Sequence, residues 1–138
     1  MRRAPIDERL ANIPLFANLS KKQLAALGGL ATVVDVGAGR ELIHQGGVGR
    51  EFFLVVEGEA EVRQDGEVIA HRGPGTVFGE TALLFDQPRN ASVVALTDMQ
   101  VEVIERRDFA ELLLDFPDLY APLLEAAAAQ LAENESRD

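Results

Sequence analysis

Short apolar segments separated by glycine-rich turns fill the middle of this chain, between residues 30 and 104. Short strands at regular spacing with glycine turns are typical of an all-β sandwich or barrel. One separator, Asp65-Gly66, is a two-residue hairpin signal. We therefore predict a mainly β domain with flanking helices, built as an antiparallel jelly-roll (double-stranded β-helix) barrel. The strand-like segments are Leu30 to Val36, Glu41 to His44, Phe52 to Val56, Ala60 to Arg63, Glu67 to His71, Val93 to Leu96 and Val101 to Ile104.

Helical patterns precede the β region. Residues 6–13 predict a short helix that ends at Pro14, because proline removes a backbone donor and clashes with the preceding turn. A second helix is predicted over residues 21–27. Ser20 is a suitable N-cap and Gln23 lies three residues further on, which is the spacing of a capping box. A glycine pair then ends this helix.

Helical spacing returns after the β region, over residues 106–115 and 118–133, with Pro117 between the two stretches. The chain therefore reads as one domain in three segments. We predict an N-terminal helical segment (1–29), a β-roll (30–105) with a binding segment at 78–93, and C-terminal helices (106–138). The whole length of 138 residues, 47% of them apolar, suits a single core.

Charge and composition exclude several classes of function. The net charge is −10, from 13 basic and 23 acidic residues, so the chain is poorly suited to coating nucleic acid or an anionic membrane. No apolar run approaches the roughly 20 residues of a membrane span, and the start of the sequence does not resemble a secretory signal. The chain has no cysteine, which excludes disulfides and favours a reducing cytoplasm.

The segment from Phe78 to Ala95, FGETALLFDQPRNASVVA, carries the most chemistry. Gly79 precedes a short helical stretch, Glu80 to Leu84, whose first N–H groups and dipole favour an anion. Arg89 is always charged and its planar guanidinium suits phosphate oxygens. The Glu80 carboxylate repels phosphate but accepts a hydrogen bond from a neutral hydroxyl. An acid for a sugar hydroxyl and an arginine for a phosphate together predict a nucleotide pocket.

The same segment resembles the phosphate-binding cassette of the cyclic nucleotide-binding domain family, with the pattern F-G-E-x-A-L-L, a short gap, and R-x-A-x-V. That family includes the bacterial cAMP receptor protein, the regulatory subunit of protein kinase A and cyclic-nucleotide-gated channels. The match is ungapped and holds both charged residues at the family's spacing. The segment P-L-F-x-x-L-S, from Pro14 to Ser20, is also similar to the start of that family's domain.

The resemblance implies a role for each cassette residue. Gly79 and Glu80 would lie against the ribose, with the carboxylate accepting from the 2′-OH. Thr81 and Ala82 would offer backbone N–H groups to the cyclic phosphate, which Arg89 would clamp. The implied ligand-binding set is Phe78, Gly79, Glu80, Thr81, Ala82, Arg89, Asn90 and Ala91.

The base side of the ligand is less strongly specified. In the family's architecture Asn90 and Ala91 would line the phosphate and base side, and the terminal helix would fold over the base as a lid. The candidate lid residues are Tyr120, Leu123 and Leu124, although a leucine and alanine stripe on a terminal helix also suits a core or a dimer seam. Asn90 stands where cGMP-preferring members place a threonine, so cAMP is the expected ligand and cGMP the alternative.

The expected function is therefore a non-enzymatic sensor that binds cAMP, moves its C-terminal helices and reports to an unidentified effector domain or protein. We expect no catalytic residue, no metal and no direct nucleic-acid binding. The terminal helix is also suited to a homodimer. Two alternatives stay open: the same fold as a protein–protein interaction module with a degenerate pocket, or a jelly-roll metal enzyme. The enzyme would need a His/Glu cluster, whereas His44 and His71 lie in different segments without acidic partners at metal spacing.

Overall fold

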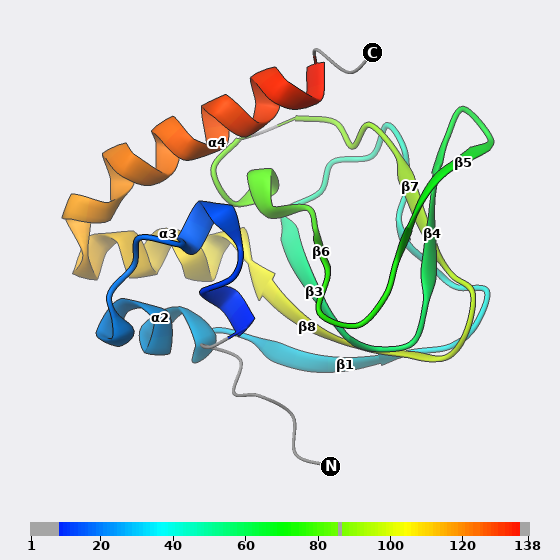
Figure 1. Cartoon of the computed structure of the whole chain (residues 1–138), viewed down its shortest axis with the longest axis horizontal. Coiled ribbons are helices and arrows are strands. Elements are labelled where there is room, and N and C mark those ends of the chain that lie inside the picture. Colours follow the sequence, from blue (N-terminus) through cyan, green and yellow to red (C-terminus); the bar gives the residue numbers. More distant parts are fainter. Residues whose placement is uncertain (1–8, 86, 136–138) are drawn as a thin grey trace.

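Two four-stranded antiparallel sheets form the body of the molecule, and the helices gather at one end of it (Figure 1). The computed structural model describes residues 9–85 and 87–135, with the backbone alone for residues 14, 80, 81, 127 and 130–135. Sheet A has the order β1 (Thr32–Val36), β8 (Met99–Glu105), β3 (Glu51–Glu57), β6 (Val77–Phe78), and sheet B the order β2 (Glu41–Ile43), β7 (Ser92–Ala95), β4 (Ala60–Gln64), β5 (Glu67–Arg72). The predicted mainly β jelly-roll with flanking helices is confirmed.

Alternating side chains of β3 build two cores, one on each face of sheet A. Phe53 and Val55 point between the sheets, where Phe53 stacks on Phe78 with ring centroids 4.9 Å apart. Phe52 and Leu54 point toward the helices, and Phe52 meets Phe16 edge-on at 5.9 Å. The inter-sheet core comprises Val36, Ile43, Phe53, Val55, Ala60, Val62, Phe78, Val93, Ala95, Met99 and Val101.

The second core, the helical core, lies between sheet A and the flanking helices. It comprises Leu10, Ile13, Leu15, Phe16, Leu24, Leu27, Phe52, Leu54, Leu83, Ile104, Phe109, Leu112, Leu119 and Leu123. Because residues from both ends of the chain share this core, the helices are an integral part of the domain.

Of the two helices predicted in the N-terminal segment, the second is confirmed. Helix α2 (Lys21–Gly28) has the capping box: the Gln23 N–H donates to Ser20 Oγ at 3.1 Å, and the Ser20 N–H donates to Gln23 Oε1 at 2.8 Å. A 3₁₀ turn, η1 (Pro14–Phe16), precedes it. The helix predicted over residues 6–13 ends earlier, at Leu10, and residues 11–13 form a turn and a bend. Leu10 and Ile13 are both buried, and Ile6 lies outside the described residues.

The C-terminal segment contains α3 (Arg106–Asp115), a 3₁₀ turn η3 (Pro117–Leu119) and α4 (Tyr120–Glu135). Helix α3 has the predicted bounds. Pro117 lies in the first positions of η3, where its missing N–H removes no helical hydrogen bond. The helix predicted over residues 118–133 runs as α4 from Tyr120 to Glu135. Within the described chain, no helix combines the length and apolar character that a membrane crossing requires.

The predicted hairpin at Asp65-Gly66 is confirmed, since both residues have the positive φ values, 53° and 84°, that a two-residue turn between β4 and β5 requires. Strand β6 was absent from the sequence prediction because two residues are too few to show an alternating pattern. The helical stretch predicted over residues 80–84 is instead a four-residue 3₁₀ turn, η2 (Glu80–Leu83).

Candidate functional site

The cassette predicted from the sequence connects β6 to β7, where the β-roll meets the helices. Its turn η2 packs against β3, α3 and α4, and its Leu83 side chain belongs to the helical core. In Figure 1 this turn lies between the strands and the long terminal helix. The cassette therefore borders both the interior of the roll and the C-terminal helices.

Because η2 is short, it attracts an anion less strongly than the predicted helix would. A helix macrodipole is the sum of many aligned peptide dipoles. A four-residue 3₁₀ turn has too few of them to supply the helix dipole predicted from the sequence. In addition, the Ala82 N–H donates to the Gly79 carbonyl at 3.1 Å. A phosphate contact through this N–H would require the turn to open. The positive charge of Arg89 thus becomes the main attraction that the cassette offers to an anion.

Backbone hydrogen bonds hold Arg89 against the loop between β2 and β3, residues 44–50. The Arg89 N–H donates to the Gly47 carbonyl at 2.8 Å, and the Gly46 N–H donates to the Arg89 carbonyl at 2.7 Å. Val48 and Pro88 form a β-bridge beside them. The main chain of Arg89 is therefore paired on both sides, which fixes where its side chain starts.

The Arg89 guanidinium lies in a cradle formed by two glycines and a carbonyl. Its Nη2 donates to the Glu51 carbonyl at 2.8 Å. A Cβ atom added to Gly49 would overlap the guanidinium, and one added to Gly79 would lie 2.8 Å from both Arg89 Nη1 and the Glu51 carbonyl. Gly79 also has a φ of +81°, which favours glycine. The absence of both side chains lets the guanidinium lie against the backbone.

The remaining cassette residues are distributed around this cradle. Phe78 is buried in the inter-sheet core, and Ala91 packs against that core. The Asn90 carbonyl accepts a hydrogen bond from Gln64 Nε2 at 3.1 Å. The side chains of Glu80 and Thr81 lie outside the described residues, so their ligand contacts stay predictions.

The three candidate lid residues are arranged differently from one another. Leu123 is only 3% exposed and belongs to the helical core, whereas Tyr120 is 49% exposed and Leu124 is partly buried. In this conformation Leu123 therefore stabilises the packing of α4. A lid role for any of the three stays a prediction.

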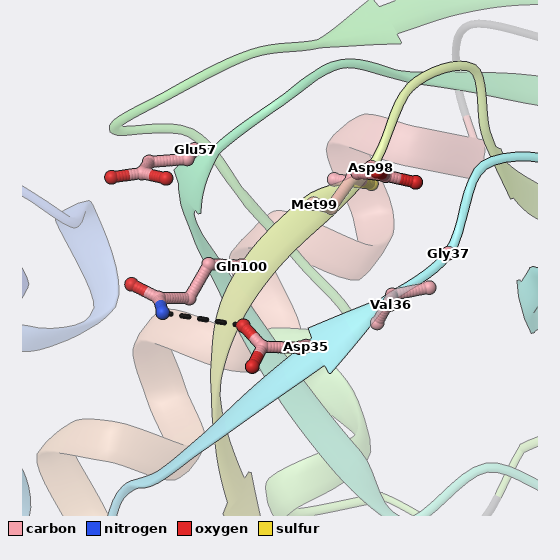
Figure 2. Close-up of a pocket in the computed structure, with 7 residues that line it drawn as sticks. All are labelled: Asp35, Val36, Gly37, Glu57, Asp98, Met99 and Gln100. Carbon is pink, nitrogen blue, oxygen red and sulfur yellow. Dashed lines mark hydrogen bonds between the residues drawn. The ribbon is translucent and has the colours of Figure 1, made fainter.

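Two cavities lie elsewhere in the roll. The first, of about 400 Å³, is lined by three carboxylates, of Asp35, Glu57 and Asp98, with Gln100 beside them (Figure 2). Gln100 Nε2 donates to Asp35 Oδ1 at 3.3 Å. Because carboxylates repel phosphate, this cavity does not suit a nucleotide. The second, of about 300 Å³, has an apolar wall and reaches Glu51, whose carbonyl holds Arg89.

The His44 side chain lies beside a carboxylate. His44 has one acidic neighbour that the sequence analysis did not name, since its Nδ1 lies 2.8 Å from Glu41 Oε1. Both side chains are exposed, and the described residues contain no group of three or more His, Asp or Glu side chains that would hold a metal ion.

Sequence reasoning missed the residues that hold Arg89, namely Gly47, Gly49 and Glu51. The available signal was the glycine-rich turn that begins with Gln45-Gly46-Gly47, for which the sequence analysis predicted only a separator between strands. Their role depends on a contact between segments some 40 residues apart in the chain, such as the one joining Glu51 and Arg89.

The structure thus combines an antiparallel β-roll, helices on both sides of it in the sequence, and an arginine held by backbone groups on the segment between β6 and β7. The family model for the cyclic nucleotide-binding domain matches residues 33–116, which is more than half of the chain. The chain belongs to the cyclic nucleotide-binding domain family.

Relatives of known type agree with this assignment. The chain is 38% identical over 108 residues to a cAMP-dependent protein kinase regulatory subunit of Eremothecium gossypii, covering 78% of this chain and 24% of that protein. It is 40% identical over 121 residues to the corresponding subunit of Mycosarcoma maydis, covering 81% and 23%. The chain thus spans about a quarter of the length of these curated relatives.

A solved structure is similar over nearly the full length. The N-terminal domain of a transcriptional regulator from Streptomyces coelicolor A3(2) has a TM-score of 0.80 and 31% identity, covering 96% of this chain and 95% of that chain. The shared fold therefore includes the flanking helices as well as the sheets.

Proposed function

We propose that this chain is a regulatory module that binds cAMP and has no catalytic role of its own. The observation that carries the proposal is the Arg89 cradle, in which a guanidinium is fixed by the Glu51 carbonyl and by the close approach of Gly49 and Gly79. Arg89 would bind the cyclic phosphate and Glu80 the ribose 2′-OH. The similarity to regulatory subunits of cAMP-dependent protein kinases supports cAMP as the ligand.

The signal would pass through η2. A phosphate that takes up the N–H groups of Thr81 and Ala82 competes with the Ala82 to Gly79 hydrogen bond. Because η2 packs against α3 and α4, opening of this turn would shift both helices. A ligand moves such an equilibrium only by its difference in affinity for the two arrangements, so the helices would report occupancy to an effector domain or protein.

Two alternatives to this proposal are an interaction module with a degenerate pocket and a module that binds cGMP. The cassette of a degenerate interaction module would be expected to lose its arginine or the space around it, and both are present here. A cGMP-binding variant would use the Asn90 side chain, at the position of the threonine in cGMP-preferring members.

We place the protein in the cytoplasm. A homodimer formed through α4 is one way in which the module would act on its effector.

Calorimetric titration of the purified chain with cAMP, cGMP and 5′-AMP tests the proposal. We expect cAMP to bind with a dissociation constant in the micromolar range or below, cGMP to bind more weakly, and 5′-AMP to bind weakly because it lacks the cyclic ester. Tight binding of cGMP with weak binding of cAMP would support the cGMP variant. A folded protein that binds neither cyclic nucleotide would support the interaction module.

A further inference from the structure

Gln45 joins three separate segments of the chain next to the cradle. Its side-chain Nε2 donates to Asp65 Oδ1 at 2.9 Å, and its Oε1 accepts from the Asp65 N–H at 2.9 Å. Its own backbone N–H donates to Ser92 Oγ at 2.8 Å. Gln45 therefore links the 44–50 loop to the β4–β5 turn and to the start of β7.

The partner of Gln45 is itself well fixed. Asp65 occupies the first position of the two-residue turn, with a φ of +53°, a conformation that aspartate and asparagine tolerate better than other residues. The strands on both sides are paired up to Gln64 and Glu67, and Gln64 also donates to the Asn90 carbonyl in the cassette. The β4–β5 turn thus offers the loop a stable attachment point.

Apart from the Gln45 side chain, the loop is attached mainly through its backbone. Gly46, Gly47 and Val48 pair with the Pro88 and Arg89 segment, and the Arg106 N–H donates to the Arg50 carbonyl at 2.7 Å. Three of its residues, Gly46, Gly47 and Gly49, have no side chain, and Val48 is 73% exposed. Glycine also leaves the backbone more freedom than any other residue. Gly46 and Gly47 nevertheless form both backbone hydrogen bonds to Arg89, and Gly49 lies against its guanidinium. The side chain of Gln45 is thus in position to hold the loop in the conformation that these contacts need.

We propose that Gln45 is a positioning residue for phosphate recognition, acting through its paired hydrogen bonds with Asp65 on the 44–50 loop and through that loop on Arg89. The inference rests on the proposed function, because it assigns to Gln45 a part in the same site. Gln45 contacts no ligand in this role. The effect of Gln45 on cAMP affinity therefore depends on the Arg89 side chain. A residue that only stabilised the fold would affect the affinity equally with or without that side chain.

A test without ligand examines the loop itself. In the Gln45→Ala variant, the Gly46 and Arg89 amide protons, which form the two hydrogen bonds between loop and cassette, should exchange with solvent about tenfold faster or more. Gln100→Ala is the matched control, since it removes another side-chain hydrogen bond between polar residues, to Asp35 in the carboxylate-lined cavity. It should leave both amides unchanged. Unchanged exchange in Gln45→Ala would overturn the inference, whichever nucleotide the protein binds.

A binding test then connects the loop to the ligand. Gln45→Ala should weaken cAMP binding roughly tenfold, and Asp65→Ala should do the same. Asp65→Asn should retain near-normal affinity, because asparagine keeps the acceptor oxygen and tolerates the positive φ. In an Arg89→Lys background the effect of Gln45→Ala should fall below about twofold. An equal loss in both backgrounds would make Gln45 a structural residue and overturn the inference. Failure of the wild-type chain to bind would count against the proposed function alone.

Discussion

At the scale of single residues, the site depends on concentrating positive charge in a protein whose net charge is −10. Local fixed groups must overcome this unfavourable overall field to hold an anion. Arg89 is suited to that task because the Glu51 carbonyl orients its guanidinium and two glycines let it lie against the backbone. A preorganised fork loses less entropy when phosphate binds than a freely moving side chain.

Gly49→Ala tests this cradle. The added Cβ would overlap the guanidinium, so we expect Arg89 to be displaced and cAMP affinity to fall at least tenfold, while the fold is retained. Gly37→Ala is the matched control, because its Cβ would meet no atom within 4 Å. Titration calorimetry and circular dichroism of both variants give the answer. Equal cAMP affinity for the two variants would show that the close approach of Gly49 is unimportant.

The sequence motif identified Gly79 and Arg89, because local patterns show glycine turns and charges. It did not identify Gly49, Glu51 or Gln45, since their importance comes from contacts with distant segments. The sequence also did not show which kind of helical turn η2 forms, and therefore which of its N–H groups are already hydrogen-bonded. Five residues after Gly79 are too few for the sequence pattern to distinguish a turn of α-helix from the 3₁₀ turn that the structure has.

At the scale of elements, the N-terminal segment is attached to the outer face of sheet A by an ion pair as well as by apolar contacts. Arg9 Nη2 lies 2.7 Å from Glu102 Oε1, and Glu102 is only 6% exposed. Its other oxygen, Oε2, is buried and has no hydrogen-bond partner among the residues that the structure describes. A buried carboxylate with one unsatisfied oxygen depends strongly on its remaining partner.

Arg9→Ala should therefore destabilise the protein by about 3 kcal/mol, because it leaves the Glu102 carboxylate buried without its countercharge. Replacing both partners, as Arg9→Met with Glu102→Leu, should recover most of the loss, since an apolar pair carries no desolvation cost. Urea denaturation of the three proteins measures these differences. A loss below about 0.5 kcal/mol in Arg9→Ala would show that the pair contributes no more than an exposed one.

Most elements were predictable, for reasons that differ along the chain. Glycine-bounded apolar segments identified seven of the strands. The capping box placed α2, and helical spacing placed α3, within a residue or so of their bounds. The two-residue β6 was missed because it becomes a strand only through its pairing with Phe53 and Leu54. The division of β3 between two cores was likewise invisible, because all its central residues are apolar.

At the scale of the whole molecule, the two cores share sheet A, and the cassette lies where they meet. Phe78 belongs to the inter-sheet core and Leu83, five residues later, to the helical core. Helix α4 packs against both η1 and η2. The packing therefore connects the cassette, through α4, to the N-terminal turn η1.

Ligand binding should consequently stabilise the entire domain. At a cAMP concentration of about 100 times the dissociation constant, linkage adds about 2.7 kcal/mol to the free energy of unfolding. For a domain of this size the melting temperature should rise by roughly 10 °C. Differential scanning calorimetry measures the shift, with 5′-AMP at equal concentration as control. A rise of less than about 1 °C with cAMP, or an equal rise with 5′-AMP, would argue against specific binding of the cyclic ester.

The most direct measurement is the cAMP dissociation constant of the wild-type chain and of Arg89→Ala, determined by titration calorimetry under the same conditions. Because the substitution removes a charge-assisted contact to phosphate, we predict that cAMP binds the wild type and binds the variant roughly a hundredfold more weakly. The two proteins should have the same circular dichroism spectrum. If the folded variant binds cAMP as tightly as the wild type, the phosphate is not held at Arg89 and the proposed site is wrong.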